Sequence, residues 1–306
     1  MSSSLTPPIR WPAEALWEAL APVLPGFTVE VLPQIDSTNT ELMRRFRGSP
    51  SGSGGPAVEP RPEPLLLVAE QQTAGRGRLG RSWQSRRGAS LTFSLGLPLA
   101  PADWSGLSLV AGISVAESLD PANLRTPGSS RIGLKWPNDL WLCSQTACGT
   151  LERKLGGILV ETASWDGLRH VVIGVGINIL PLELAPSGAA SPLGAMPPGC
   201  LQALLPGVEA PQALLRIVPP LVQAVQAFAQ FGFAPFQSRF AARDVLAGRA
   251  VQLSGGPLPV EGTAHGAGEN GALLVHTAAG MKEITSSEVS VRPVTAATPP
   301  REAPPC

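Results

Sequence analysis

The chain has 306 residues, of which 43% are hydrophobic, and this length suits about two globular domains with a sizeable core. Its 23 Lys and Arg residues balance its 23 Asp and Glu residues, which excludes an overall positive field able to hold DNA by its backbone. No stretch offers the ~18 uncharged apolar residues that a membrane-spanning helix needs, and the N-terminus lacks the apolar centre of a signal peptide. We therefore expect a cytoplasmic protein.

Stretches rich in Gly, Pro and Ser interrupt the chain at 48–64 and 181–212, where we expect mobile insertions, and the Pro-rich tail 295–306 is expected to be disordered. Elsewhere, the spacing of apolar residues predicts helices over 104–119 and 213–231. Strands are predicted over 64–71, 88–97, 131–136, 156–164 and 169–179.

Three further signals refine this arrangement. Asp166-Gly167, between two predicted strands, indicates a hairpin turn. Pro219 and Pro220 must lie in the first turn of the second helix or kink it. After Asp244, short strands alternate with glycine turns, which predicts a small β-barrel or sandwich of about fifty residues.

Cysteine and histidine usage does not indicate a metal cluster. Cys143, Cys148, Cys200 and Cys306 form no C-x-x-C pair, and the chain has only three histidines. We expect ordinary reduced thiols.

The segment AGRGRLGRSW, residues 74–83, contains a G-x-G-x-x-G spacing that elsewhere marks a dinucleotide-binding turn. That turn must open a helix, because the pyrophosphate lies at the helix N-terminus. Here the glycines lead instead into a strand-like alternation that contains Gly88. The sequence therefore favours a different use of this loop.

Arginine is concentrated in and after this loop. Five arginines lie within residues 76–87, and no Asp or Glu occurs between Glu70 and Asp103. A solvated surface of mixed charge is the alternative, but it would normally intersperse the two signs. Glycine allows close backbone approach and guanidinium groups bind phosphate or carboxylate, so the loop is predicted to bind an anion.

Five motifs give the chain a family resemblance. They occur in the order DSTNTEL (36–42), QQTAGRGRLGRSW (71–83), KWPNDL (135–140), KLGGILVE (154–161) and GVGIN (174–178), and with the C-terminal GENGALLV and EVSVRP they make residues 28–294 resemble biotin protein ligases. The resemblance implies a two-step reaction. Biotin and MgATP give biotinyl-5′-AMP and pyrophosphate, and a lysine of a biotin carboxyl carrier domain then attacks the adenylate.

The resemblance also implies an α+β fold of the class II synthetase-like, biotin/lipoate ligase type, with a mixed sheet packed against helices. The expected parts are a short N-terminal extension (1–27), a catalytic domain (28–243), and a small SH3-like β-barrel (244–294) before the tail. A helix-turn-helix domain, as in relatives that act as repressors, has no place in 1–27, so no sequence-specific DNA binding is expected. A homodimer is possible within the family.

The matched motifs imply roles for named residues. Lys154, Arg78 and Asp139 are expected to be catalytic, with Lys154 stabilising developing negative charge and Asp139 either holding Mg²⁺ or helping to deprotonate the carrier lysine. The residues expected to bind biotin are Ser37, Thr38, Asn39, Gln72, Gly75, Arg76, Lys154, Gly156 and Gly157. Those expected to bind ATP or the adenylate are Arg78, Arg81, Trp83, Lys135, Asn138 and Asn178.

Simpler interpretations of these residues remain open on sequence alone. DSTNTEL is also a helix N-cap signal, Pro137-Asn138-Asp139 is also an ordinary turn, and Lys154 also suits an exposed strand start. Trp136 is expected in the core. Residues 143–153 are expected to alter access to Lys154 or to form a longer surface turn.

Two other functions remain in view. A lipoate ligase or octanoyltransferase shares the fold but would be expected to lack the arginine-rich loop. A non-catalytic regulator that binds biotin or nucleotide would keep the pocket without Lys154 or the arginines.

Overall fold

The structure, a computed structural model, describes residues 8–47, 63–165, 167–181, 198–254, 260–285 and 290–293. Most of the expected insertion at 48–64, residues 182–197 of the second insertion, and the tail from 294 lie outside the described residues. None of the helices in the described part of the chain combines the length and hydrophobicity needed to cross a membrane.

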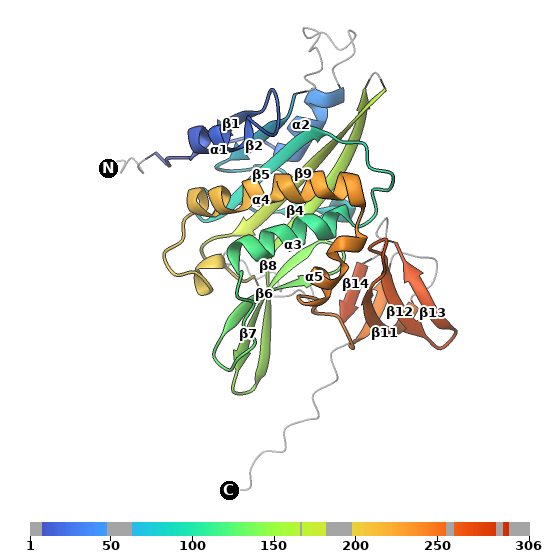
Figure 1. The fold of residues 1–306 in the computed structure, drawn as a ribbon. Coiled ribbons are helices and arrows are strands. Elements are labelled where there is room, and N and C mark those ends of the chain that lie inside the picture. Colours follow the sequence, from blue (N-terminus) through green and yellow to red (C-terminus); the bar gives the residue numbers. More distant parts are fainter. Residues whose placement is uncertain are drawn as a thin grey trace, which may run out of the picture.

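A seven-stranded mixed sheet forms the centre of the larger part of the molecule, in the order β1-β2-β5-β9-β8-β7-β6 (Figure 1). Only β1 and β2 run parallel, and the other neighbouring pairs are antiparallel. Its strands are β1 (Thr28–Leu32), β2 (Leu65–Ala69), β5 (Ser90–Pro98), β6 (Ser130–Lys135), β7 (Asp139–Thr146), β8 (Gly149–Trp165) and β9 (Leu168–Asn178). The helices are α1 (Ala13–Leu20), α2 (Thr38–Arg47), α3 (Leu107–Leu119), α4 (Ala210–Phe231) and α5 (Gln237–Ala241).

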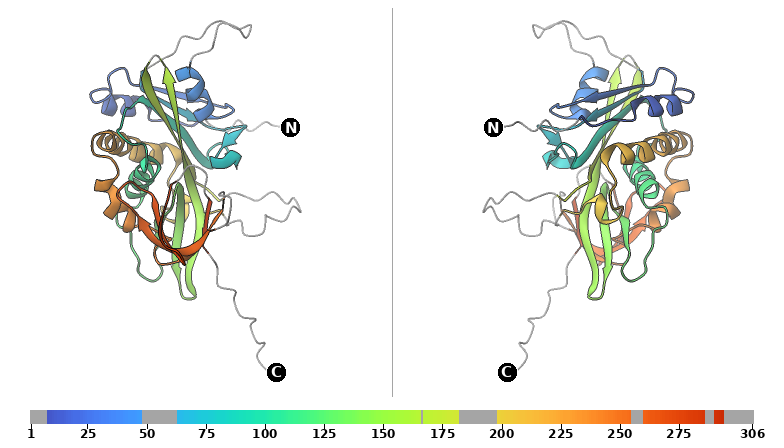
Figure 2. Two further views of the ribbon diagram at one scale, coloured as in Figure 1. Left: turned by 90° about the vertical axis from the view of Figure 1, so that its right-hand side faces the viewer. Right: turned by 90° about the vertical axis from the view of Figure 1, so that its left-hand side faces the viewer.

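The sheet has a helix layer on each face, because its strands alternate between two sets of side chains. Leu66 and Val68 of β2 join the main core with α3 and α4, whereas Leu65 and Leu67 join a smaller cluster with α2. The views in Figure 2 show α3 and α4 on one side of the strands and α2 on the other.

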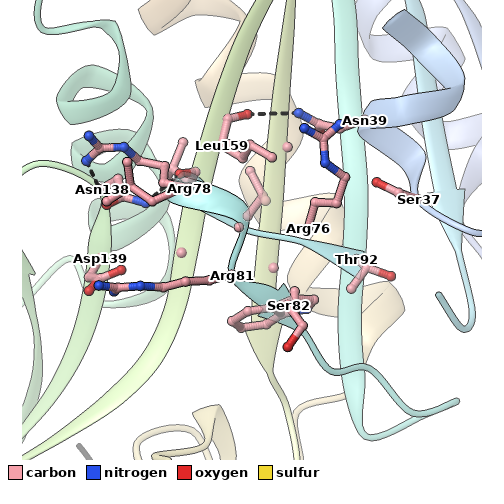
Figure 3. Close-up of a pocket in the computed structure, with 18 of the residues that line it drawn as sticks. Ser37, Asn39, Arg76, Arg78, Arg81, Ser82, Thr92, Asn138, Asp139 and Leu159 are labelled. Carbon is pink, nitrogen blue, oxygen red and sulfur yellow. Dashed lines mark hydrogen bonds between the residues drawn. The ribbon is translucent and has the colours of Figure 1, made fainter. Parts of the chain in front are cut away.

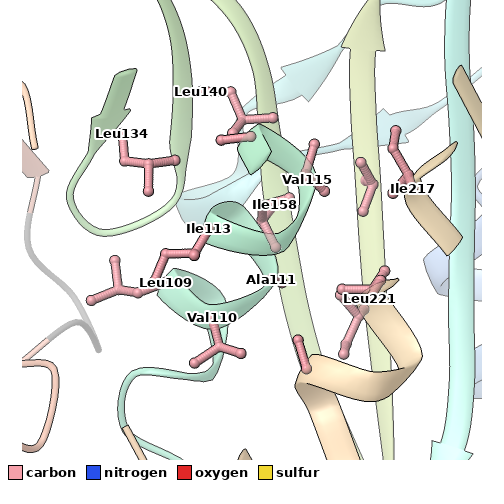
Figure 4. Packing of buried hydrophobic residues seen from close by; sticks show 14 of the residues in the cluster. Leu109, Val110, Ala111, Ile113, Val115, Leu134, Leu140, Ile158, Ile217 and Leu221 are labelled. Atoms are coloured by element: carbon pink, nitrogen blue, oxygen red, sulfur yellow. The ribbon is translucent and has the colours of Figure 1, made fainter. Parts of the chain in front are cut away.

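Figure 4 shows the centre of the main core, where α3 packs between the strands and α4. Its labelled side chains are Leu109, Val110, Ala111, Ile113 and Val115 of α3, Leu134, Leu140 and Ile158 of the sheet, and Ile217 and Leu221 of α4. Burial of this many aliphatic side chains is the main stabilising contribution to such a fold.

The second sheet is antiparallel, in the order β13-β12-β11-β10-β14, and lies beside α5 (Figure 1). Its strands are β10 (Ala250–Ser254), β11 (Val260–Ala267), β12 (Leu273–Thr277), β13 (Gly280–Ile284) and β14 (Ser290–Pro293). It is tied to the larger part by Trp136, whose Nε1 donates to the Gly271 carbonyl at 3.0 Å. Trp136 is 1% exposed, so the expectation that it lies in the core is confirmed.

The α+β class is confirmed, and several local expectations hold. Trp165 pairs with Leu168 across the turn that contains Gly167, as the hairpin signal predicts. Residues 74–83 form β3 (Gly75–Arg76), the 3-10 turn η1 (Arg78–Gly80) and β4 (Ser82–Trp83), so no helix follows the glycines and the dinucleotide interpretation is excluded.

Two local features differ from expectation. Residues 143–153 extend the β7–β8 hairpin, because Cys143 pairs with Glu152 and the pairing continues to Thr146 and Gly149. Residues 198–212 are folded rather than a mobile insertion: Leu201 of the 3-10 turn η2 (Leu201–Ala203) is fully buried, and α4 begins at Ala210.

The two prolines and the N-terminal segment also take defined places in the fold. Pro219 and Pro220 lie in the middle of α4, where Pro220 is exposed, so the alternative that they lie in its first turn is wrong. Helix α1, inside the expected extension 1–27, places Leu16 and Leu20 in the main core, so it is an integral layer of the larger part.

Candidate active site

The face of the sheet that carries α2 also forms the floor of a polar-lined cavity. On β5, Leu91, Phe93 and Leu95 belong to the main core, so Thr92 and Ser94 face the other side. Both hydroxyl side chains are buried. Thr92 lines the cavity with its Oγ1 donating to the Ala69 carbonyl at 2.8 Å, whereas Ser94 lies behind Thr38 and Asn39.

Two glycines on the neighbouring strand β9 make room over this floor. A Cβ on Gly174 would lie 2.1 Å from Asn39 Oδ1, and one on Gly176 would lie 2.5 Å from Trp83 Cε2. Glycine within a strand often marks such a close approach. The GVGIN motif therefore lets Asn39 and Trp83 lie directly against the sheet.

The DSTNTEL segment is both a helix start and a cavity wall. The Thr40 amide donates to Ser37 Oγ at 3.4 Å, which places Ser37 at the N-terminal end of α2. The backbone amide and Oγ1 of Thr38 donate to Gln72 Oε1 at 2.7 and 3.1 Å. Ser94 Oγ lies 2.7 Å from Thr38 Oγ1 and is fully buried behind this end of the cavity.

Both the nitrogen and the oxygen of the Asn39 side-chain amide form hydrogen bonds within the protein. Its Nδ2 donates to the Leu159 carbonyl at 3.2 Å (Figure 3). The same Nδ2 donates to Glu161 Oε2 at 3.0 Å. Its Oδ1 accepts from Ser94 Oγ at 2.6 Å. Because both amide protons are used, only an acceptor lone pair of Oδ1 is left for a ligand.

The arginine loop crosses in front of this floor. Its backbone is closed by a bond from the Gly77 amide to the Arg81 carbonyl at 2.7 Å, and Leu79 has a left-handed φ of 55°. A Cβ on Gly75 would lie 2.4 Å from the Trp83 carbonyl oxygen, so glycine is required for the β3–β4 pairing. Figure 3 shows Arg76, Arg78 and Arg81 along the cavity.

Cationic groups collect at the opposite end of the cavity from Thr38. Lys154 Nζ lies 2.7 Å from Asp139 Oδ1, and Lys135 Nζ lies 3.7 Å from Asp139 Oδ2. Arg78 Nη1 donates to Asn138 Oδ1 at 3.4 Å (Figure 3). One carboxylate thus faces two ammonium groups beside a guanidinium, which leaves a local positive excess for an anionic ligand.

Burial makes these cations more dependent on nearby negative charge. It lowers the pKa of Lys135, Asp139 opposes that change, and the ammonium of Lys154 adds to it. Burial likewise lowers the pKa of Arg78, again against the effect of Asp139. A phosphate or carboxylate placed here would compensate charges that the protein itself compensates incompletely.

A Mg²⁺ ion bound directly to Asp139 does not fit these contacts well, because both carboxylate oxygens already face lysine ammonium groups. No group of three His, Cys, Asp or Glu side chains suited to a metal occurs in the described ranges. The contacts favour a role for Asp139 in orienting Lys154 and Lys135. Any Mg²⁺ that accompanies ATP would then be held mainly by the phosphates.

Most of the residues expected in the site line one cavity. The expected residues that line it are Ser37, Thr38, Asn39, Gln72, Arg76, Arg78, Arg81, Trp83, Lys135, Asn138, Asp139, Lys154 and Gly157. Gly75, Gly156 and Asn178 do not line it. Asn178 is 4% exposed and donates to the Gly199 carbonyl at 3.0 Å, so it holds the folded segment that begins at residue 198.

Several cavity residues were not predicted from the sequence. Those with the clearest role are Thr92 of β5, Leu159 of β8, Gly174 and Gly176 of β9, and Val291 of β14. The glycines had a signal, since glycine inside an apolar strand suggests a close neighbour. Val291 had none, because it reaches the cavity from the second sheet through tertiary packing alone.

Comparisons with known proteins agree with this geometry. Residues 31–178 match the Biotin/lipoate A/B protein ligase family, and residues 247–292 match the Biotin protein ligase C terminal domain. The chain is 35% identical to the bifunctional ligase/repressor BirA of Escherichia coli over 88% of this chain and 75% of that protein. It is 31% identical to the biotin–[acetyl-CoA-carboxylase] ligase of Paracoccus denitrificans over 85% of this chain and 98% of that protein.

A solved structure shows the same relationship. The biotin protein ligase from Aquifex aeolicus, in complex with biotin and ATP, is 29% identical and superposes with a TM-score of 0.64, covering 87% of this chain and 99% of that chain. Sequence identity, both family models and the fold agree, and the chain belongs to the biotin protein ligase family.

Proposed function

We propose that the protein is an AMP-forming biotin protein ligase. In the first step a biotin carboxylate oxygen attacks the α-phosphorus of ATP, and pyrophosphate leaves to give biotinyl-5′-AMP. In the second step the neutral amine of a carrier lysine attacks the acyl carbon, AMP leaves, and an amide forms. The carrier is proposed to be the biotin carboxyl carrier domain of acetyl-CoA carboxylase or a related carboxylase.

The observation that carries this proposal is the two-ended cavity. Thr38 and Gln72, with Ser94 hydrogen-bonded behind Thr38, form a neutral hydrogen-bonding end suited to a ureido ring. Lys154 and Arg78 supply positive charge at the other end, where two anionic reactants must meet. Neither group is a nucleophile in this scheme, and both act by stabilising negative charge that develops at the carboxylate and α-phosphate.

The second step needs a carrier lysine without its proton, and the free pKa of a lysine is about 10.4. Asp139 is the acidic side chain at the cationic end, and its Oδ1 is held by Lys154 at 2.7 Å. We propose that Asp139 first orients Lys154 and then accepts a proton from the incoming amine as that contact loosens.

Biotin-dependent exchange of labelled pyrophosphate into ATP tests the first step, with lipoate and octanoate run in parallel. We expect exchange with biotin alone, because a lipoyl chain has no ureido group to use the Thr38–Gln72 end. Exchange with lipoate or octanoate but not with biotin would support the alternative acyl ligase. Tight biotin binding without any exchange would support the non-catalytic regulator.

A mass increase on a purified biotin carboxyl carrier domain, with loss of that increase when its target lysine is replaced, tests the second step. Two further expectations stay predictions: a possible homodimer, tested by sedimentation, and the absence of sequence-specific DNA binding. A promoter footprint at physiological salt would contradict the latter.

A further inference from the structure

Glu161 joins two parts of the cavity wall that are far apart in sequence. It lies on β8, two residues after Leu159, and its side chain is 22% exposed. Its Oε2 accepts from Asn39 Nδ2 at 3.0 Å, and its Oε1 lies 3.5 Å from Arg76 Nη2. A single carboxylate therefore contacts both the first turn of α2 and the arginine loop.

The contact with Asn39 is the fixed one. Asn39 is 3% exposed, and its amide also bonds to the Leu159 carbonyl and to Ser94. The absence of a side chain at Gly174 lets Asn39 lie against the sheet. Glu161 is thus anchored to Asn39 beside the polar end of the cavity.

The contact with Arg76 is the loose one. The Arg76 side chain is 52% exposed, and its Nη1 also donates to Thr40 Oγ1 over a long 3.4 Å contact. Exposed ion pairs of this kind contribute little in water. The same pair strengthens when water is excluded, as it would be under a loop closed over a ligand.

A carboxylate is an unexpected group in the surroundings of a cavity that takes a carboxylate and phosphates, because like charges repel. Its contacts indicate a structural role for this carboxylate. Glu161 presents a negative charge to Arg76, while Asn39 occupies the other oxygen of the carboxylate.

We propose that Glu161 is a positioning residue that couples the arginine loop to the polar end of the cavity. By holding Asn39 it keeps that wall in place, and by pairing with Arg76 it favours the closed loop over the bound adenylate. The inference rests on the proposed function, since it assumes that biotinyl-5′-AMP is the ligand retained.

The test compares Glu161→Gln with Glu161→Ala in the full chain. Gln keeps an oxygen that can accept from Asn39, but it presents an uncharged amide donor to Arg76 in place of a carboxylate oxygen. Ala removes both contacts. We expect Glu161→Gln to speed dissociation of preformed biotinyl-5′-AMP by about 3–10-fold with little change in the biotin KM, as for loss of a weak ion pair. We expect Glu161→Ala to speed dissociation and also to raise the biotin KM.

Two further measurements separate positioning from general stability. Glu152→Gln is the matched control, because Glu152 lies on the same strand and pairs with Arg249 through a 2.7 Å contact to its Nη1. It should leave adenylate dissociation unchanged. In an Arg76→Gln background, adding Glu161→Gln should cause no further increase in dissociation, because its partner is already absent.

The outcomes keep the two proposals distinct. If wild-type protein fails to form or retain biotinyl-5′-AMP, the proposed function is wrong. If the wild type retains it and Glu161→Gln dissociates at the same rate, the coupling through Arg76 is wrong. Additive effects of Glu161→Gln and Arg76→Gln would also overturn it, as would a Glu161→Ala defect confined to a lower melting temperature.

Discussion

Lys154 Nζ and Asp139 Oδ1 lie 2.7 Å apart across the adjacent strands β7 and β8, at the cationic end of the cavity. The Lys154 side chain is 36% exposed, so its ammonium is open to the cavity while one carboxylate oxygen orients it. This arrangement suits a group that stabilises charge formed during a reaction. It also leads to the first prediction.

Lys154→Ala should lower adenylate formation far more than it weakens biotin binding, because the contact strengthens as charge develops. Removal of one such donor typically costs on the order of 3 kcal/mol in the barrier, or a few hundredfold in rate. Pyrophosphate exchange and calorimetric biotin binding measure the two effects. The control is Lys282→Ala, at an exposed position on β13. Equal losses of rate and affinity would make Lys154 a binding residue only.

The pH dependence of the exchange reaction should report the protonation state of Lys135. Its pKa is lowered by burial, and Asp139 opposes that decrease. Activity that needs the charged ammonium is therefore lost as pH rises through the lowered pKa. Asp139→Asn should move this alkaline loss to lower pH, and Lys135→Arg should move it to higher pH, since a guanidinium stays charged. Identical alkaline limbs in all three proteins would remove Lys135 from the mechanism.

Substitution of the two glycines of β9 should weaken the binding of two different substrates. Gly174→Ala pushes on Asn39 and should raise the KM for biotin, whereas Gly176→Ala pushes on Trp83 and should raise the KM for ATP. Overpacking costs about 1–3 kcal/mol, which corresponds to roughly 5–150-fold. Gly112→Ala on α3 is the control, because its Cβ would meet Leu134 at an ordinary 3.4 Å. The reverse pattern would show that the two ends of the cavity are wrongly assigned.

These residues also show how far a sequence can define the site. The motifs located Lys154, Asp139, Ser37 and the arginine loop, because each contributes a chemically distinctive side chain or glycine pattern. Asn178 carries an equally distinctive side chain, yet it bonds to the Gly199 carbonyl and holds a neighbouring segment. Residue type indicates what a side chain can bind, and only tertiary packing decides its partner.

The strands show the same difference between what the sequence pattern predicts and what tertiary packing decides. The alternation in 90–97 predicts β5, but it does not tell whether the hydroxyl face meets water or a ligand. In the folded protein Ser94 contacts Thr38 and Asn39 of α2, and Thr92 lines the cavity beside it. Residues 143–153 lack a strong strand pattern, and they become strand because the β7–β8 hairpin supplies their backbone partners.

Asp244 predicts a pH-dependent stability. Burial raises its pKa from 3.8 to about 6, and the Leu246 amide bonds to Oδ1 at 2.8 Å. A raised pKa means that this group stabilises the fold fully below pH ~4 and that the contribution is lost as pH rises through 6, by about 1–3 kcal/mol. Urea unfolding of Asp244→Asn should therefore show a smaller loss of stability between pH 4.5 and 7.5 than the wild type. An equal loss in both proteins would contradict the role of Asp244.

The arginine loop provides the last prediction. Its own backbone contacts are the short β3–β4 pairing and the 3-10 turn, and Arg76 is half exposed, so ligand contacts should contribute much of its order. Biotinyl-5′-AMP offers a phosphate to the guanidinium groups and an apolar ring system to the floor, and the closed loop would shield the reactive anhydride from water.

Trypsin should cut after Arg76, Arg78 or Arg81 in the free protein and be blocked when biotin and MgATP are present. Biotin with a non-hydrolysable ATP analogue that cannot form the adenylate is the control, and it should protect less. Equal cleavage in every state, or resistance without any ligand, would show that the loop does not close in response to the adenylate.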